Sequence, residues 1–436
     1  MIVSVKNFGQ IASASIDMST FSLFVGHNNS GKTLMMQLIY GVIDYLTRHI
    51  DISEHYTFGE LPITIDNTNF PEIEAAVNKV LHEKKDEIVF NIFKRRIPIE
   101  ELWVEFGGIK HHFLLKEMAE TDSDIYAFPL SGLDKGNKYY LLICDNSWLM
   151  RSKPNSTNTE LLESVIRTVF SKILLNYTSD RWTRFSFLPA SRTGILLLYK
   201  QALANSLEMY NKQEENEFGL TQPVWDFMMF MLRYKHIPHS SIANRHIISF
   251  INTHLIDGKL KIEEEEVIYT PKGTKLQVPI YLTSSMVNEL SPLIHLLTAY
   301  KTPRCIFYDE VETCLHPLKQ IEMARLLVRM VNADYKMIVS THSDTMAAAI
   351  DNLILLSAAK DRDEKAKKLG YDENDFLKPE KLDNVHVYQF IPDKNGRTTV
   401  TELAPYFESG HGYNFDIFNA SNDKIYHDAM TILEDA

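Results

Sequence analysis

The sequence predicts an α/β fold in which a mixed β-sheet is flanked by helices. Three apolar runs support this prediction, at residues 21–25, 305–308 and 337–340. The first leads into a glycine-rich segment and then into a helical pattern, and the other two end in charged or polar residues. Apolar runs of this length with polar ends are typical of buried strands.

The glycine-rich segment is FVGHNNSGKT, residues 24–33, which fits the pattern G-x-x-x-x-G-K-[ST]. A strand before it and the helical spacing of residues 34–46 after it would aim backbone N–H groups and a helix N-terminus at an anion. Lys32 would reach the β/γ-phosphates, and Thr33 would ligate Mg²⁺. We therefore predict that a nucleoside triphosphate is held by the residues of this segment, namely Gly26, Asn28, Asn29, Ser30, Gly31, Lys32 and Thr33.

Short strands are expected before this segment, at 2–5 and 12–17, with a turn at 7–9. Residues 1–50 would then form the first part of the nucleotide-binding core. Residues 51–180 are predicted to be a largely helical insertion that does not continue the core sheet.

Two local patterns lie inside this insertion. A hairpin is expected over 103–113, with Gly107 and Gly108 at its turn. Thr157 and Glu160 form a capping box, and the residues after them have the apolar spacing of one helical face. A helix is therefore predicted after the capping box.

Residues 181–345 are predicted to supply most of the remaining core. Between 243 and 282 the apolar period and the turn residues indicate an antiparallel β subdomain, and a helix is expected over 287–300.

Residues 346–436 are predicted to complete the core and to end in a tail that contacts a partner or another copy of the chain. A charged loop is expected at 359–368. A hairpin is expected at 385–403 around Asn395 and Gly396.

The strand at 305–308 ends in two carboxylates, Asp309 and Glu310, within CIFYDEVETCLHP. Taken alone, the pair is equally compatible with a strand that ends in a solvated acidic loop. Beside a triphosphate site, the first carboxylate can hold Mg²⁺ through its water and the second can orient and deprotonate an attacking water. We predict that Asp309 and Thr33 serve as metal ligands and that Glu310 is the catalytic base.

Composition limits the classes of function. Hydrophobic residues make up 45% and charged residues 23%, and 45 Lys and Arg against 57 Asp and Glu give a formal charge of −12. This balance disfavours wrapping of a polyanion, although a local basic face stays open. The three cysteines lack CxxC spacing, which argues against a disulfide framework or a zinc ribbon. With no signal peptide and with apolar stretches broken by Gln37 and Asp44, we expect a cytoplasmic protein without membrane contact.

The motif set resembles the ABC-type ATPases related to RecF, SMC heads and OLD proteins. It is most similar to the AAA15-like ATPases of bacterial antiphage systems such as Septu, PARIS and certain retrons. The resemblance is carried by NFGQI, GHNNSGKT, FLPASRTGI, YLTSSMVNEL, DEVETCLHP and STHS, in this order over the first 345 residues. It implies a P-loop NTPase fold of ABC-ATPase type, with ATP and Mg²⁺ as ligands.

The resemblance also assigns a role to His342, which follows the strand at 337–340. Such ATPases place a histidine that senses the γ-phosphate 33 residues after the first acid, as here (342 minus 309). We therefore predict that His342 is a catalytic residue. A lone histidine at a strand end is more often a hydrogen-bonded structural residue, and that alternative stays open.

In the related ATPases, two lobes enclose each nucleotide, and the second lobe offers a signature segment. Ser284 lies where this segment would fall, 25 residues before Asp309 (309 minus 284). Ser284 and Ser285 would contact the γ-phosphate from a second copy of the chain. The usual glycines are replaced by Ser285 and Met286, which predicts weaker engagement and slow turnover. A polar helix cap at 283–285 is the alternative.

Arg192 lies in LPASRTG, ahead of a helix expected near Gly194. The resemblance makes it a candidate for contact with the nucleotide or with the facing subunit. A structural pair with a local carboxylate is equally compatible with the sequence.

We thus predict an ATPase that self-associates and regulates a separate effector protein, a nuclease or a toxin, in an antiphage defence system. No nuclease motif follows STHSD. Two alternatives are a RecF-like DNA-maintenance ATPase, which the net charge disfavours, and a nucleotide-gated binding module with negligible hydrolysis.

Overall fold

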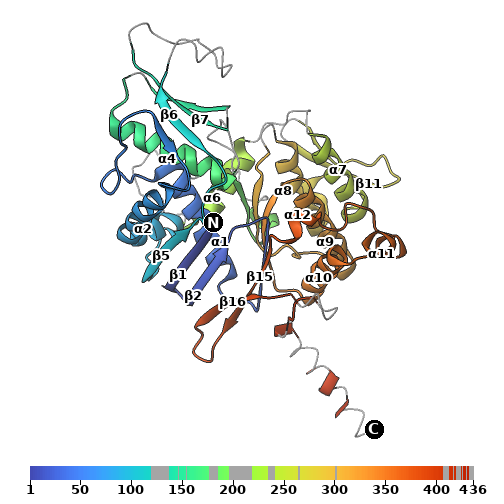
Figure 1. Cartoon of the computed structure of the whole chain (residues 1–436). Coiled ribbons are helices and arrows are strands. Elements are labelled where there is room, and N and C mark those ends of the chain that lie inside the picture. Colours follow the sequence, from blue (N-terminus) through green and yellow to red (C-terminus); the bar gives the residue numbers. More distant parts are fainter. Residues whose placement is uncertain are drawn as a thin grey trace, which may run out of the picture. The chain divides into compact units, whose positions relative to one another are not determined.

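The computed structural model describes residues 1–118, 137–145, 147–153, 155–175, 185–195, 219–233, 241–263, 266–299, 302–405, 412–415, 417–418, 424, 426–428 and 430–431. The chain divides into two compact units (Figure 1). Unit 1 comprises Met1–Gly9, Ser13–Asp17 and Gln37–Arg184. Unit 2 comprises Gln10–Ala12, Met18–Met36 and Phe185–Ala436.

Unit 2 contains a mixed sheet whose strands follow the order β16-β15-β3-β14-β13-β9. The strands from β15 to β9 run parallel, and β16 is antiparallel to β15. All residues of β3, β9 and β13 are buried, as expected for strands covered on both faces. The bounds are β3 Phe21–Gly26, β9 Phe185–Leu188, β13 Cys305–Tyr308, β14 Lys336–Thr341, β15 Val385–Pro392 and β16 Thr398–Leu403. The predicted hairpin at 385–403 is confirmed.

Helices pack against this sheet through one apolar cluster that includes Leu293, Leu326 and Met346. Local capping sets where two of these helices begin. The Ser343 hydroxyl accepts from the Met346 N–H at 3.2 Å, and Pro317 opens the next helix upstream. The helices are α6 Gln222–Arg233, α7 Ile242–Phe250, η2 Ile251–Leu255, η3 Ile280–Leu282, α8 Ser285–Thr298, α9 Pro317–Asn332, α10 Asp344–Ala358, α11 Arg362–Leu369 and α12 Pro379–Leu382.

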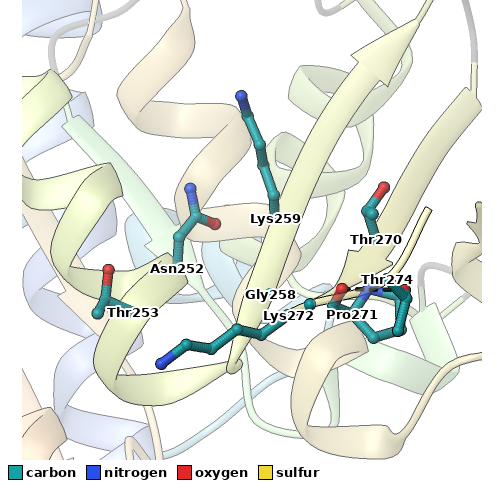
Figure 2. A pocket seen from close by; sticks show the side chains of 9 residues that line it. Asn252, Thr253, Gly258, Lys259, Thr270, Pro271, Lys272 and Thr274 are labelled. Carbon is teal, nitrogen blue, oxygen red and sulfur yellow. Dashed lines mark hydrogen bonds between the residues drawn. The ribbon is translucent and has the colours of Figure 1, made fainter. Parts of the chain in front are cut away.

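A small antiparallel sheet of unit 2 is formed by β10 Gly258–Glu263, β11 Glu266–Pro271 and β12 Val278–Pro279. It confirms the β subdomain, but the prediction is wrong for residues 243–255, which form α7 and η2. Ser241 caps α7 by accepting from the Asn244 N–H at 3.1 Å, a signal that the strand interpretation overlooked. A pocket of about 330 Å³ lies at this sheet. Asn252, Lys259 and Lys272 are among the residues that line it (Figure 2).

The charged segment expected to be a loop at 359–368 is largely the helix α11, so that prediction is wrong. Its charges alternate at helical spacing and pair at i and i+4, with Lys365 to Asp361 at 2.8 Å and Lys368 to Glu364 at 2.7 Å. Gly370 ends the helix in the left-handed conformation.

Unit 1 contains strands in the order β5-β1-β2, with bounds β1 Ile2–Phe8, β2 Ile11–Asp17 and β5 Glu101–Glu105. Of β2, the part from Ser13 onward belongs to unit 1. A second sheet has the order β4-β6-β7-β8, with bounds β4 Ile63–Ile65, β6 Phe113–Glu117, β7 Tyr140–Cys144 and β8 Ser147–Arg151. The helical elements are α1 Lys32–Asp44, whose first turns belong to unit 2, η1 Tyr45–His49, α2 Phe70–Phe93 and α4 Asn158–Leu175. None of the helices in the described ranges is long and apolar enough to cross a bilayer.

Two predictions about 51–180 are wrong in detail. No hairpin forms over 103–113, because β5 pairs with β1, whereas β6 pairs with β4 and β7. The segment therefore adds a strand to the sheet of β1 and β2, which was not expected, and its described part carries a second sheet besides the helices α2 and α4. Gly107 and Gly108 have positive φ angles, which glycine adopts without strain, but the strands on either side of them do not pair.

The capping box is confirmed at the start of α4. The Thr157 hydroxyl accepts from the Glu160 N–H at 3.3 Å, and the Glu160 carboxylate accepts from the Thr157 N–H at 2.9 Å. The apolar face of α4 is buried, including Val165, Val169 and Phe170.

We expect Thr157→Ala to weaken the first turn of α4 by about 1 kcal/mol, because the Glu160 N–H loses the hydroxyl that accepts its hydrogen bond. Amide hydrogen exchange in this turn should then accelerate about fivefold. Thr159→Ala, at an exposed position of the same turn, is the control. Equal exchange rates in the two variants would contradict a role for the cap.

Candidate functional site

The predicted site residues other than Ser284 and Ser285 gather at one edge of the unit 2 sheet, where parallel strands end side by side. The glycine-rich segment follows β3, His342 follows β14, and Asp309 and Glu310 follow β13. Arg192 lies shortly after β9, the next strand. Crevices at the carboxyl ends of parallel strands are the usual place for ligands in open α/β sheets.

The glycine-rich segment forms a tight loop between β3 and α1. Asn29 and Gly31 have φ angles of 64° and 93°. Left-handed residues of this kind let successive backbone N–H groups form a concave anion-binding turn. The Gln10 side chain supports this loop by donating to the Asn29 carbonyl at 2.7 Å. A Cβ on Gly26 would lie 2.8 Å from the Phe390 carbonyl oxygen, so only glycine fits there. Gln10 was not predicted, although NFGQI was noted as a motif.

The Lys32 ammonium lies back on the loop. It donates to the carbonyls of Gly26 at 2.7 Å and His27 at 2.8 Å, and the residue is buried. Burial lowers the pKa of Lys32, while the nearby carboxylates of Asp309 and Glu312 act in the opposite direction. The cation thus lies inside the loop and close to the acidic residues, as a phosphate-binding lysine requires.

Asp309 is the junction of the site. It is 1% exposed, and its carboxylate accepts from the Thr33 hydroxyl at 2.9 Å and from the Ser340 hydroxyl at 2.5 Å. Burial raises the pKa of Asp309, whereas these two hydrogen bonds oppose the rise. The Thr33 hydroxyl and the Asp309 carboxylate are hard oxygen donors within 3 Å of each other, which fits a Mg²⁺ ion. Ser340 is a contributor that the sequence analysis missed.

Glu310 adopts a left-handed backbone conformation with φ of 45°. Its N–H donates to the Ser340 hydroxyl at 2.8 Å, and its carboxylate accepts from the Thr313 hydroxyl at 3.4 Å. A residue other than glycine held in this region stores strain, which is commonly found at functional sites. Glu310 is partly exposed, whereas the neighbouring Asp309 is buried.

His342 is held by a second acid, Glu312. One carboxylate oxygen of Glu312 accepts a hydrogen bond from the backbone N–H of His342 at 2.7 Å. The same oxygen lies 3.1 Å from Nδ1 of the His342 imidazole. Glu312 is buried, and its other oxygen has no hydrogen-bond partner among the described residues. Sequence analysis missed Glu312, although a third acid in DEVE was a visible signal. The structure therefore brings His342 to the same strand edge as Asp309.

Ser284 and Ser285 do not take part in the hydrogen bonds described above for Lys32, Asp309 and His342. Ser284 is the residue before α8 and makes no side-chain cap, and both serines are exposed. The segment just before them exposes Tyr281 at 63% and Leu282 at 67%. In the described part of one chain, no hydrogen bond joins the serine pair to Lys32. The predicted contact from a second copy therefore stays a prediction.

Arg192 is buried within unit 2 rather than open to a ligand. Its Nε lies 2.8 Å from the Glu289 carboxylate, and Nη1 donates to the carbonyls of Pro189 and Asp309, both at 2.8 Å. Its guanidinium also stacks on the Tyr308 ring at 4.7 Å. The side chain is 1% exposed. These contacts favour the alternative in which Arg192 is a structural partner of a carboxylate.

We expect Arg192→Met to destabilise unit 2 by about 3–5 kcal/mol, because Glu289 is then buried without its cation. Urea unfolding should show this loss, and Arg192→Met with Glu289→Leu should recover much of it. Lys365→Met, which breaks an exposed pair on α11, is the control. Normal stability together with lost ATP affinity would instead make Arg192 a nucleotide contact.

Comparison with known proteins agrees with the site. A family model described as an AAA ATPase domain matches residues 1–125. No curated protein matches the chain. Among solved structures, an Smc head bound to the C-winged helix domain of ScpA is 12% identical with a TM-score of 0.40, covering 94% of this chain and 98% of that one.

Two further structures are similarly distant. The SMC head domain from Thermotoga maritima is 13% identical with a TM-score of 0.37, covering 92% of this chain and 98% of that one. An Smc head domain with an extended coiled coil, bound to the C-terminal domain of ScpA and derived from Pyrococcus furiosus, is 14% identical with a TM-score of 0.37, covering 100% and 98%. Scores this low transfer no activity and no partner.

The loop, the lysine and the acidic strand end together identify the site as that of a P-loop nucleotide-binding fold. The phosphate-binding segment lies within the part of the chain that matches the AAA ATPase domain. The pocket in Figure 2 is lined by residues of η2, β10, β11 and the turn after β11, none of which belongs to this site.

Proposed function

We propose that the chain binds ATP with Mg²⁺ and hydrolyses it at the edge formed by β3, β14 and β13. The hydrogen bond between the Thr33 hydroxyl and the Asp309 carboxylate carries this proposal, because it joins the phosphate-binding loop to the acidic strand end. In P-loop enzymes these two elements hold the same metal ion. This contact between residues 276 positions apart supports a shared metal site at this place.

Each residue has a task that follows from its placement. Loop N–H groups and the N-terminus of α1 would face the phosphates, and Lys32 would leave the Gly26 carbonyl to neutralise them. Thr33 and Asp309 would hold Mg²⁺, which supplies charge neutralisation when bound. Glu310 would orient and deprotonate the attacking water, and Glu312 would fix the orientation of the His342 imidazole.

We further propose that two or more copies enclose the nucleotide, with Ser284 and Ser285 reaching the γ-phosphate of a partner copy. The exposure of both serines, together with that of Tyr281 and Leu282, supports this arrangement. The order of motifs along the chain supports a regulatory role in antiphage defence, in which ATP occupancy controls a separate effector.

We expect Lys32→Ala to weaken ATP binding by at least about tenfold. A charge-assisted hydrogen bond to phosphate contributes about 1.5–3 kcal/mol of binding free energy. In the alanine variant, water that fills the space of the side chain does not supply the lost positive charge. Calorimetric titration with ATP and Mg²⁺ measures the loss. Lys259→Ala, in the pocket of Figure 2, should bind as the wild type does. An unchanged dissociation constant for Lys32→Ala would refute the site.

We expect Glu310→Gln to keep ATP affinity and to lower the rate of phosphate release by about 10²–10⁴-fold, because the general base is lost. Sedimentation of this variant with ATP should show a dimer or larger species that is absent without ATP. Glu364→Gln, on exposed α11, is the control. If wild-type protein binds ATP but releases no phosphate, the chain is a nucleotide-gated binding module instead.

A further inference from the structure

A mixed cluster of metal-ligating side chains lies in unit 1, on the sheet of β6 and β7. The Nδ1 atom of His111 lies 2.7 Å from the Asp145 Oδ2 atom, and the Cys144 thiol lies 3.2 Å from the same oxygen. One ligand atom from each of the three residues falls within 4.8 Å of the other two. The nucleotide site, which is built from unit 2 residues, uses none of them.

The pairing of β6 with β7 creates this cluster. The strands are antiparallel, and Phe113 at the start of β6 pairs with Cys144 at the end of β7 (Figure 1). His111 just before β6 and Asp145 just after β7 therefore meet at one end of the sheet. Asp145 has a φ of 48°, and its Oδ1 atom accepts from the His112 N–H at 3.4 Å. This hydrogen bond leaves Oδ2 facing the imidazole and the thiol.

We propose that His111, Cys144 and Asp145 form a binding site for one Zn²⁺ ion or a divalent cation of similar softness. Nitrogen, sulfur and oxygen donors are the set that Zn²⁺ accepts, and three protein ligands leave a fourth position for water. A thiolate selects against Mg²⁺, so this site and the nucleotide site take different metals. The site goes beyond the proposed ATPase activity and does not depend on it.

The distances suit such an ion. Bond lengths of about 2.0–2.3 Å in a tetrahedral site place ligand atoms about 3.3–3.7 Å apart. The two distances to Oδ2 are 2.7 and 3.2 Å, and all three ligand atoms lie within 4.8 Å of one another, so side-chain shifts of about 1 Å bring them to these spacings. The side chain of Asp145 is 53% exposed and that of His111 28%, which gives the ion access, whereas Cys144 is buried.

Binding would change the protonation of the thiol. Burial, together with the Asp145 carboxylate, raises the pKa of Cys144 to about 12, so without metal the thiol is protonated and unreactive. The metal takes the place of that proton, which leaves to solvent, and the imidazole binds as the tautomer protonated on Nε2. No oxidant or reductant is needed.

Titration of the full chain with Co²⁺, without nucleotide or Mg²⁺, tests the site. We expect one equivalent to produce thiolate-to-cobalt charge-transfer absorption, which Zn²⁺ then abolishes by displacement. Cys144→Ser should remove this absorption. His111→Gln and Asp145→Asn should each weaken Co²⁺ binding by about tenfold or more. Cys314→Ser, at an exposed cysteine of unit 2, is the matched control and should keep the signal.

Absence of the charge-transfer band in the wild type, or its persistence in Cys144→Ser, would overturn the proposal. Circular dichroism of each variant checks folding. Should Cys144→Ser fail to fold, Asp145→Asn decides the question, because its amide oxygen can still accept from the His112 N–H. Unchanged Co²⁺ affinity in Asp145→Asn and His111→Gln would then refute the site.

Discussion

The buried carboxylate of Asp309 is the group on which the rest of the nucleotide site depends. Burial of a carboxylate without partners costs several kcal/mol, so Asp309 must be satisfied by hydrogen bonds or by a cation. Its partners Thr33 and Ser340 belong to the start of α1 and to β14, while Asp309 itself follows β13. One carboxylate thus fixes three elements against each other. The same oxygens are those that a metal ion would use.

A buried ion pair between Arg192 and Glu289 contacts the backbone of Asp309. Arg192 neutralises Glu289 of α8 and donates to the backbone carbonyl of Asp309. The N-terminus of α8 carries Ser284 and Ser285, so the signature-like segment and the acidic turn share a rigid link within one copy. Because a buried pair is costly to break, a displacement at α8 would be transmitted to the turn at Glu310. This link joins the segment that we propose to face a second copy to the turn that carries the proposed base Glu310.

Local sequence patterns predicted the elements whose stability is local. The runs at 21–25, 305–308 and 337–340 are short and mostly apolar, as predicted for buried strands, and all three form strands. The capping box at Thr157 and the Asn395-Gly396 turn also proved accurate, since their hydrogen bonds span only a few residues. The failed hairpin came from long-range pairing. The stretch at 103–113 has the pattern of a hairpin, but β5 pairs with β1, about 100 residues earlier in the chain, and not with β6.

The sequence by itself determined the phosphate-binding loop, the acidic strand end and the histidine strand, because each is a short motif with its own backbone requirement. Only the tertiary structure decided how they meet. Parallel strand order places Asp309 beside Ser340, and burial turns Arg192 into a structural cation and Glu312 into the partner of His342. The roles of Arg192 and Glu312 depend on whether their charged groups are removed from water on folding. Packing between segments that are distant in sequence decides this burial, so a local sequence pattern does not predict it.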